Sequence, residues 1–272
     1  MSFSHKLRQV QQSANSLVCV GLDPDLTRMP KHLLRYGNPA LEFNRQIIEK
    51  THDLVCAYKL NLAFYEALGE PGWRTIKQTL ECIPSHIVTI ADGKRGDIGN
   101  TAAMYARSVY DELGFDACTV NPYMGFDSVE PFLRDENRCA FVLALTSNPG
   151  ARDFEYLRVK GKPLYEHVIA RVKKWNVKKN CGLVVGATRP KELRRIRALA
   201  PSMPILIPGI GTQGGDLVSA VRFGCDRSGR LALLNSSRDI LYASDSEDSP
   251  WAAREAARRL RDNINEIRAR SF

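Results

Sequence analysis

The sequence contains no hydrophobic run that approaches the roughly 20 residues needed to cross a bilayer. Its first eight residues, MSFSHKLR, lack the apolar segment that characterises a secretory signal peptide. We therefore expect a cytoplasmic protein with no membrane partner. No linker rich in proline, glycine or serine interrupts the chain, and there is no internal repeat or low-complexity tract. These absences predict one domain that spans residues 1–272.

Spacings typical of metal or redox sites are also missing. The five histidines form no HxH or HxxxH pair, and the seven cysteines form no CxxC pair. A transition-metal site is therefore not expected. The number of cysteines is odd and several lie within apolar runs, which favours reduced thiols in the core over disulfides.

The chain carries a net charge of +9, which permits nucleic-acid binding as one interpretation. Much of the basic excess lies in two helical segments, Pro190–Arg197 and Trp251–Arg270, and the second also contains acidic residues. We interpret these segments as solvated helix faces, and the surplus charge would also attract an anionic substrate. A nucleic-acid partner is not expected, because carboxylates at the predicted strand ends would repel phosphates.

Eight short apolar runs rich in β-branched residues alternate with longer helical patterns. They are near-continuously apolar, as strands buried on both faces should be. The predicted strands are Leu17–Leu22, Leu54–Leu60, Ile87–Ala91, Ala117–Val120, Ala140–Leu145, Gly182–Val185, Pro204–Ile207 and Leu231–Leu234.

The segments between the strands have helical periodicity and recognisable helix ends. The predictions are a first helix with Phe3, Leu7 and Val10 on one face, helices over Asn100–Leu113 and Lys162–Trp175, and a last helix with Ser249 as N-cap and Pro250 at its first position. Eight βα units in a chain of this size predict an α/β fold, a single (β/α)8 TIM barrel with an extra N-terminal helix. A doubly wound open sheet is the alternative.

Polar residues follow the predicted strands at their carboxyl ends, where the loops of a barrel build the active site. Asp92 and Lys94 directly follow the third predicted strand, and residues two apart on a strand share a face. A carboxylate beside a lysine favours the ammonium form, and such an ammonium can donate a proton to a carbanion. The alternative is a structural salt bridge at the barrel rim.

The loops after the seventh and eighth strands predict a phosphate site. Glycines in Gly209–Gly215 let backbone N–H groups approach an oxyanion, and Arg238 supplies a charged fork. Simple turn glycines are the alternative for that loop. Asp23 and Lys59, at the ends of the first two strands, could equally form a rim ion pair.

At these positions the sequence resembles the orotidine 5′-phosphate decarboxylase family, in its longer bacterial branch. The family signature D-x-K-x-x-D-I is met by residues 92–98, and the threonine expected four residues after the second aspartate is Thr101. The loop P-G-x-G-x-Q-G-G-D is met by residues 208–216, and Arg238 follows the eighth strand. The resemblance runs from the first strand to the eighth.

The resemblance implies roles for individual residues. The implied catalytic residues are Lys59, Asp92, Lys94 and Asp97, with Lys94 as the proton donor. The implied substrate-binding residues are Asp23 and Lys59 for the ribose, Ser147 and Pro208 for the pyrimidine, and Gln213, Ser237 and Arg238 for the phosphate. Thr146 is the alternative to Ser147. Asp97, Ile98 and Thr101 are implied to reach the site of a partner subunit in a homodimer.

The implied reaction is decarboxylation of orotidine 5′-monophosphate to UMP, the last step of de novo pyrimidine nucleotide synthesis, with no cofactor and no metal. Two other enzyme classes share parts of the pattern. Sugar-phosphate decarboxylases and hexulose-phosphate synthases carry a similar third strand and use magnesium. A Schiff-base aldolase would use Lys59 or Lys94 as its nucleophile.

Overall fold

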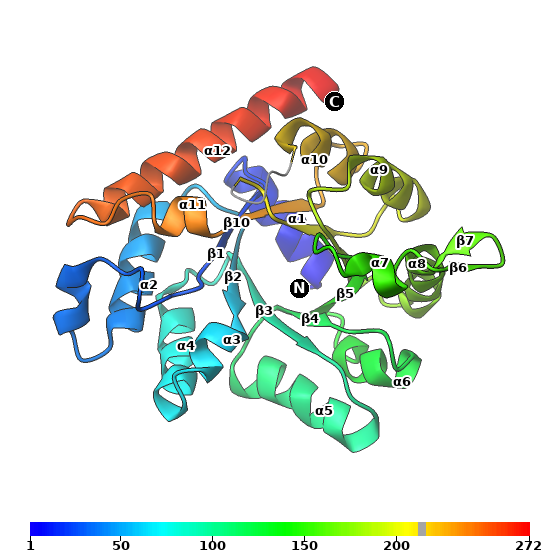
Figure 1. Ribbon diagram of the computed structural model, residues 1–272, viewed down its shortest axis with the longest axis horizontal. Coiled ribbons are helices and arrows are strands. Elements are labelled where there is room, and N and C mark those ends of the chain that lie inside the picture. Colours follow the sequence, from blue (N-terminus) through cyan, green and yellow to red (C-terminus); the bar gives the residue numbers. More distant parts are fainter. Residues whose placement is uncertain (212–215) are drawn as a thin grey trace.

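The computed structural model describes residues 1–211 and 216–272. Within them, eight parallel strands close into a barrel, in the order β1-β10-β9-β8-β5-β4-β3-β2 (Figure 1). Their bounds are β1 Val18–Gly21, β2 Ala57–Asn61, β3 Val88–Arg95, β4 Ala117–Val120, β5 Cys139–Leu145, β8 Cys181–Val185, β9 Ile205–Pro208 and β10 Ala232–Ser236. The first and last strands pair in parallel, with Val18 opposite Leu234, so the sheet has no open edge. The predicted barrel is confirmed, and the open sheet was the wrong alternative.

Helices surround the barrel and connect consecutive strands (Figure 1). The α-helices are α1 Phe3–Ser13, α2 Pro39–Thr51, α3 Leu62–Glu66, α4 Glu70–Cys82, α5 Gly99–Arg107, α6 Phe126–Val129, α7 Ala151–Phe154, α8 Leu164–Trp175, α9 Pro190–Leu199, α10 Leu217–Gly224, α11 Arg238–Leu241 and α12 Ser249–Ser271. Short 3-10 helices cover Lys31–Arg35 and Glu130–Leu133, and a π-helical turn covers Ser108–Glu112. A small antiparallel pair, β6 Arg158–Val159 and β7 Lys162–Pro163, precedes α8.

Several boundaries differ from the sequence predictions. Strand β3 continues past Ala91 to Arg95, so the polar cluster lies within the strand. The last helix begins at Ser249, so Ser249 is its first residue and Asp248 is the N-cap. The helix predicted over Asn100–Leu113 is divided into α5 and the π-helical turn that follows it. Helix ends depend on local hydrogen bonds that periodicity does not specify.

Helix α1 closes one end of the barrel. Gln11 donates a side-chain hydrogen bond to the carbonyl of Ala232 at 2.8 Å and accepts one from the N–H of Leu231 at 3.0 Å. The ring of Phe3 packs edge-on against Phe141 on β5, with 5.9 Å between centroids. These contacts place α1 at the amino ends of the strands, at the opposite end of the barrel from the strand ends that carry the polar residues.

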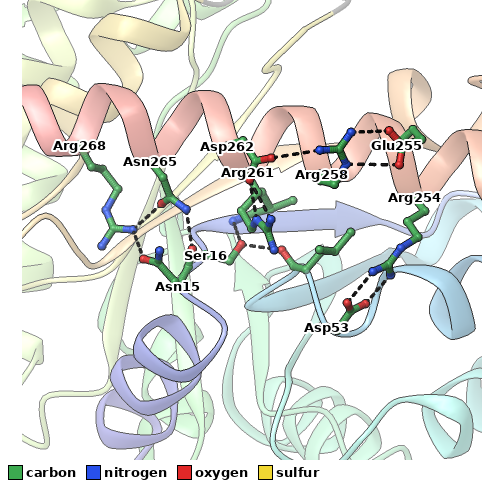
Figure 2. A network of polar contacts seen from close by, with 12 residues as sticks. Asn15, Ser16, Asp53, Arg254, Glu255, Arg258, Arg261, Asp262, Asn265 and Arg268 are labelled. Atoms are coloured by element: carbon green, nitrogen blue, oxygen red, sulfur yellow. Dashed lines mark hydrogen bonds and ion pairs between the residues drawn. The ribbon is translucent and has the colours of Figure 1, made fainter.

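The basic helix α12 runs along the outside of the barrel (Figure 1), and most of its arginines make ion pairs or hydrogen bonds. Figure 2 shows Arg254 bound to Asp53, at 2.6 and 2.8 Å, and Arg258 paired with Glu255 at 2.7 Å. Much of the positive charge of this helix is therefore offset locally. Within the described part of the chain, no helix combines the length and apolarity needed to cross a bilayer.

Candidate active site

A cavity of about 570 Å³ opens at the carboxyl ends of the barrel strands. Eight of the residues predicted from the sequence line it: Asp23, Lys59, Asp92, Lys94, Ser147, Pro208, Ser237 and Arg238. They come from the first, second, third, fifth, seventh and eighth barrel strands or the loops that follow them. The closed parallel sheet brings all these strand ends to one mouth.

Four charged side chains form a continuous row across one wall of this cavity. The ammonium of Lys59 lies 2.9 Å from Asp92 and 3.7 Å from Asp23. The other carboxylate oxygen of Asp92 lies 2.7 Å from the ammonium of Lys94. The row therefore alternates in sign, and Asp92 holds both lysines.

Burial gives this row an unusual electrostatic balance. The side chain of Lys59 is only 5% exposed and that of Asp92 is 11% exposed. Burial by itself would raise the pKa of Asp92, but Lys59 and Lys94 lower it well below its usual range. Burial would likewise lower the pKa of Lys59, and the carboxylates of Asp23 and Asp92 raise it above its usual range. Both groups are therefore charged at neutral pH.

Lys94 reaches the cavity from a distorted piece of strand. Its φ is +45°, in the left-handed region that residues other than glycine rarely adopt. The pairing of β3 with β4 shifts between Ala91 and Arg95, which indicates a bulge. The sequence reasoning expected Lys94 to join Asp92 through regular strand alternation. The two side chains do meet, but an irregular backbone brings them together.

The side chain of Lys94 is half exposed, in contrast to Lys59. One end of the charged row is therefore buried in the barrel, and the other projects into the cavity. A partly solvated ammonium at the cavity end can donate a proton to a bound molecule. The buried end can hold that ammonium in place.

Thr119 on β4 contacts this charged row and was missed by the sequence reasoning. Its hydroxyl donates to Asp92 at 2.9 Å and accepts the backbone N–H of Lys94 at 2.9 Å. A buried threonine in an apolar strand has no sequence signal that separates it from ordinary core residues.

The part of the cavity lined by the loops after β9 and β10 has features of an anion site. Pro208 on β9 pairs with Asn235 on β10, which places the loops after these strands side by side. Gly209 and Gly211 have φ values of +91° and +95°, which glycine adopts without strain. Ser237 and Arg238 follow β10 at the same edge and line the cavity. Gln213, predicted as a phosphate ligand, lies outside the described residues.

A glycine on β1 allows the β10 loop to approach. A Cβ atom added at Gly21 would lie 1.9 Å from the hydroxyl of Ser237. Ser237 therefore fits at the cavity only because position 21 has no side chain. Gly186 likewise leaves room for the loop after β5, because a Cβ atom added at Gly186 would lie 2.8 Å from Ser147.

The loop after β5 carries both candidates for a pyrimidine contact. The hydroxyl of Thr146 lies 2.8 Å from the carboxylate of Glu155 and 2.6 Å from the side-chain oxygen of Asn148, and it can donate its one proton to either, within its own loop. Ser147 also lines the cavity. Leu143, Val184 and Leu206 add apolar side chains to the lining of the cavity.

Residues of the β1 loop form a rim that the sequence reasoning did not anticipate. The guanidinium of Arg28 lies 4.4 Å from the ring centroid of Tyr242. The Tyr242 hydroxyl accepts the N–H of Asp25 at 2.8 Å and donates to the carbonyl of Asp23 at 3.1 Å. These contacts join the loops of adjacent strands β1 and β10 around the cavity.

The three residues predicted to reach a partner lie away from the cavity of their own chain. Asp97, Ile98 and Thr101 are not among the described residues that line it. The carboxylate of Asp97 accepts the N–H of Ile98 at 2.8 Å, and the Ile98 side chain is 54% exposed. Their predicted role in a partner's site stays a prediction.

Comparisons with known proteins agree on one family. The profile described as "Orotidine 5'-phosphate decarboxylase / HUMPS family" matches residues 16–249. A protein of Dehalococcoides mccartyi named orotidine 5'-phosphate decarboxylase is 50% identical over 99% of this chain and the whole of its own length. Two solved structures from Leishmania donovani are also similar. Its OMP decarboxylase has a TM-score of 0.87 and 40% identity, with 99% of both chains covered.

The second similar structure is the UMP synthase of Leishmania donovani. It has a TM-score of 0.89 and 42% identity to this chain, and the match covers 98% of this chain and 57% of the UMP synthase chain. The residues that the family profile matches include all four members of the charged row, Asp23, Lys59, Asp92 and Lys94. On these matches, the chain belongs to the orotidine 5′-phosphate decarboxylase / HUMPS family.

Proposed function

We propose that this protein converts orotidine 5′-monophosphate to UMP and carbon dioxide, with Lys94 as the proton donor and with no cofactor. The observation that supports this most directly is the ammonium of Lys94, held 2.7 Å from Asp92 at the mouth of the cavity. Residues suited to a phosphate, Ser237 and Arg238, line the same cavity. Membership of the family and the named relatives support the same substrate.

The charged row suits the chemistry of this reaction. When the bond to the carboxyl group breaks, its electron pair stays on the pyrimidine carbon and carbon dioxide leaves. A fixed ammonium beside that carbon stabilises the developing negative charge more than it stabilises the delocalised substrate. Lys94 then transfers its proton to the same carbon, which gives UMP, and the neutral amine is protonated again from solvent.

The remaining residues bind and orient the nucleotide. Arg238 and Ser237 would hold the phosphate, while Asp23 and Lys59 would bind ribose hydroxyls. Ser147 and Pro208 would contact the pyrimidine. Binding energy from the phosphate, distant from the reacting carbon, would then be used to hold the ring against the Lys94 ammonium.

We also propose a homodimer in which Asp97 of the partner subunit approaches Lys94, with Ile98 and Thr101 of the partner subunit beside it. Exposed apolar side chains near these residues suit an interface: Met104 is 57% exposed and Tyr123 is 82% exposed. Within one chain the row holds two ammonium groups and two carboxylates, so its charges balance. A third carboxylate would anchor Lys94 from the side that Asp92 does not occupy.

The test of the reaction is to add orotidine 5′-monophosphate to the purified protein and to follow the ultraviolet absorbance as orotate becomes uracil. Activity should survive EDTA. Loss of activity with EDTA and its return with magnesium would instead indicate the metal-assisted members of the family. Inactivation by borohydride in the presence of substrate would indicate a Schiff base on Lys59 or Lys94.

Lys94→Ala should abolish turnover and leave UMP binding measurable, because the substitution removes the proton donor but not the phosphate site. Turnover is measured by the absorbance assay and UMP binding by calorimetry. Near-normal decarboxylation by this variant would remove Lys94 from the mechanism.

Mixing the inactive variants Lys94→Ala and Asp97→Ala tests the shared site. Random heterodimers would each contain one site with both native residues, so about one quarter of the wild-type activity should return. Activity that stays at the level of the separate variants after exchange of subunits would contradict a site shared between chains. Sedimentation of the mixture confirms that dimers have formed.

A further inference from the structure

Thr119 makes two hydrogen bonds that link the two most important groups of the charged row. Its hydroxyl proton goes to a carboxylate oxygen of Asp92, at 2.9 Å. The hydroxyl oxygen of Thr119 also accepts the backbone N–H of Lys94, at 2.9 Å. The side chain is 1% exposed and is not among the residues that line the cavity. Thr119 therefore acts on substrate only through these neighbours.

The backbone N–H of Lys94 needs this partner because β3 bulges there. Ala91 pairs with Cys118, and the next pairing of the strand joins Arg95 to Val120. Four residues of β3 thus advance against two residues of β4, and Lys94 lies in the unpaired part. A backbone N–H inside a protein must be satisfied. The Thr119 hydroxyl replaces the missing strand partner.

The same hydroxyl fixes the carboxylate of Asp92. One oxygen of Asp92 receives Lys59 at 2.9 Å, and the other receives both Lys94 at 2.7 Å and Thr119 at 2.9 Å. Thr119 is the uncharged donor of this set and lies within strand β4. Its bond would persist when Lys94 gives up a proton and its own attraction for Asp92 weakens.

We propose that Thr119 is a positioning residue of this site, which holds the left-handed backbone of Lys94 and the carboxylate of Asp92 in one fixed relation. The inference rests on the proposed decarboxylation. Because the hydroxyl controls both the origin of the Lys94 side chain and its anchor, its loss would let the ammonium shift away from the reacting carbon. Substrate binding at the phosphate and ribose contacts would not change, since Thr119 touches neither.

The test compares Thr119→Val with Thr119→Ser. Valine keeps the shape and removes both hydrogen bonds, whereas serine keeps the hydroxyl. We expect Thr119→Val to lower kcat by a factor of about 10 to 100, with KM and the UMP dissociation constant changed by less than about threefold. Thr119→Ser should regain most of the wild-type kcat. If the valine variant does not fold, Thr119→Ala carries the same expectation.

Thr79→Val is the matched control. Thr79 is also a fully buried threonine, its hydroxyl accepts a hydrogen bond from Asn44 at 3.0 Å, and neither residue lines the cavity. The Thr79→Val variant should lose thermal stability but keep the wild-type kcat. An unchanged kcat in Thr119→Val, or a fall in kcat that serine does not rescue, would overturn the inference. Absence of decarboxylation by the wild-type protein would instead refute the proposed function.

Discussion

Replacement of Asp92 by asparagine should destabilise the fold, because it leaves Lys59 buried with one carboxylate in place of two. At an effective dielectric constant of about 20, a charge pair at the 2.9 Å of Lys59 and Asp92 attracts by roughly 6 kcal/mol. The pair with Asp23 at 3.7 Å retains roughly 4.5 kcal/mol. Removal of one partner of a buried ion pair typically costs about 3–5 kcal/mol.

Since Asp23 remains and asparagine still offers an oxygen to Lys59, we expect the free energy of unfolding to fall by about 2–4 kcal/mol. Denaturation by urea at neutral pH measures this loss. Asp245→Asn, which alters an exposed aspartate, is the control and should change the free energy of unfolding by less than about 0.5 kcal/mol.

The pH dependence gives a second readout of Asp92→Asn. In the native protein burial raises the pKa of Asp92, but the positive charges of Lys59 and Lys94 outweigh burial. The pKa of Asp92 therefore lies below its usual range. Its stabilisation is therefore complete above the ordinary aspartate pKa of about 3.9 and is lost as the pH falls toward the folded value. The variant should lose stability less steeply below about pH 4. Equal stability of the two proteins, or identical acid slopes, would refute this account of the row.

Two further substitutions test the phosphate end. Arg238→Ala should raise the KM for orotidine 5′-monophosphate by a factor of about 10 to 100, because a hydrogen bond to a charged group contributes about 1.5–3 kcal/mol; steady-state kinetics measures it, and an unchanged KM would remove Arg238 from the phosphate site. Gly21→Ala should also weaken UMP binding, since the new methyl group would lie 1.9 Å from the Ser237 hydroxyl. Calorimetry with UMP checks this, and tight binding by the alanine variant would show that the β10 loop adjusts.

The sequence predicted the barrel because eight apolar runs had the length and composition of strands buried on both faces. It also predicted most of the charged row. Parallel strands in a closed sheet bring their carboxyl ends together, so polar residues at strand ends must share one mouth. Asp23, Lys59 and Asp92 are neighbours for this reason, although long stretches of chain separate them.

The helix boundaries were less predictable. Ser249 had the residue type of an N-cap, but the helix begins at Ser249 itself and Asp248 precedes it. The carboxylate of Asp248 accepts hydrogen bonds from Ser244 and Ser246 instead of capping the helix. Competing partners in the preceding loop decided this helix start, and spacing alone does not reveal them.

Only the tertiary structure decided how Lys94 reaches the cavity. Its φ of +45° and the bulge of β3 follow from contacts with the neighbouring strand, where Thr119 supplies the missing hydrogen bond. The position of Arg28 over Tyr242 likewise requires that β1 and β10 be adjacent, which follows from closure of the barrel. Residue types and periodicity determine which side chains the chain offers and at which strand ends. The distances and hydrogen bonds between distant segments arise only when those strands pair.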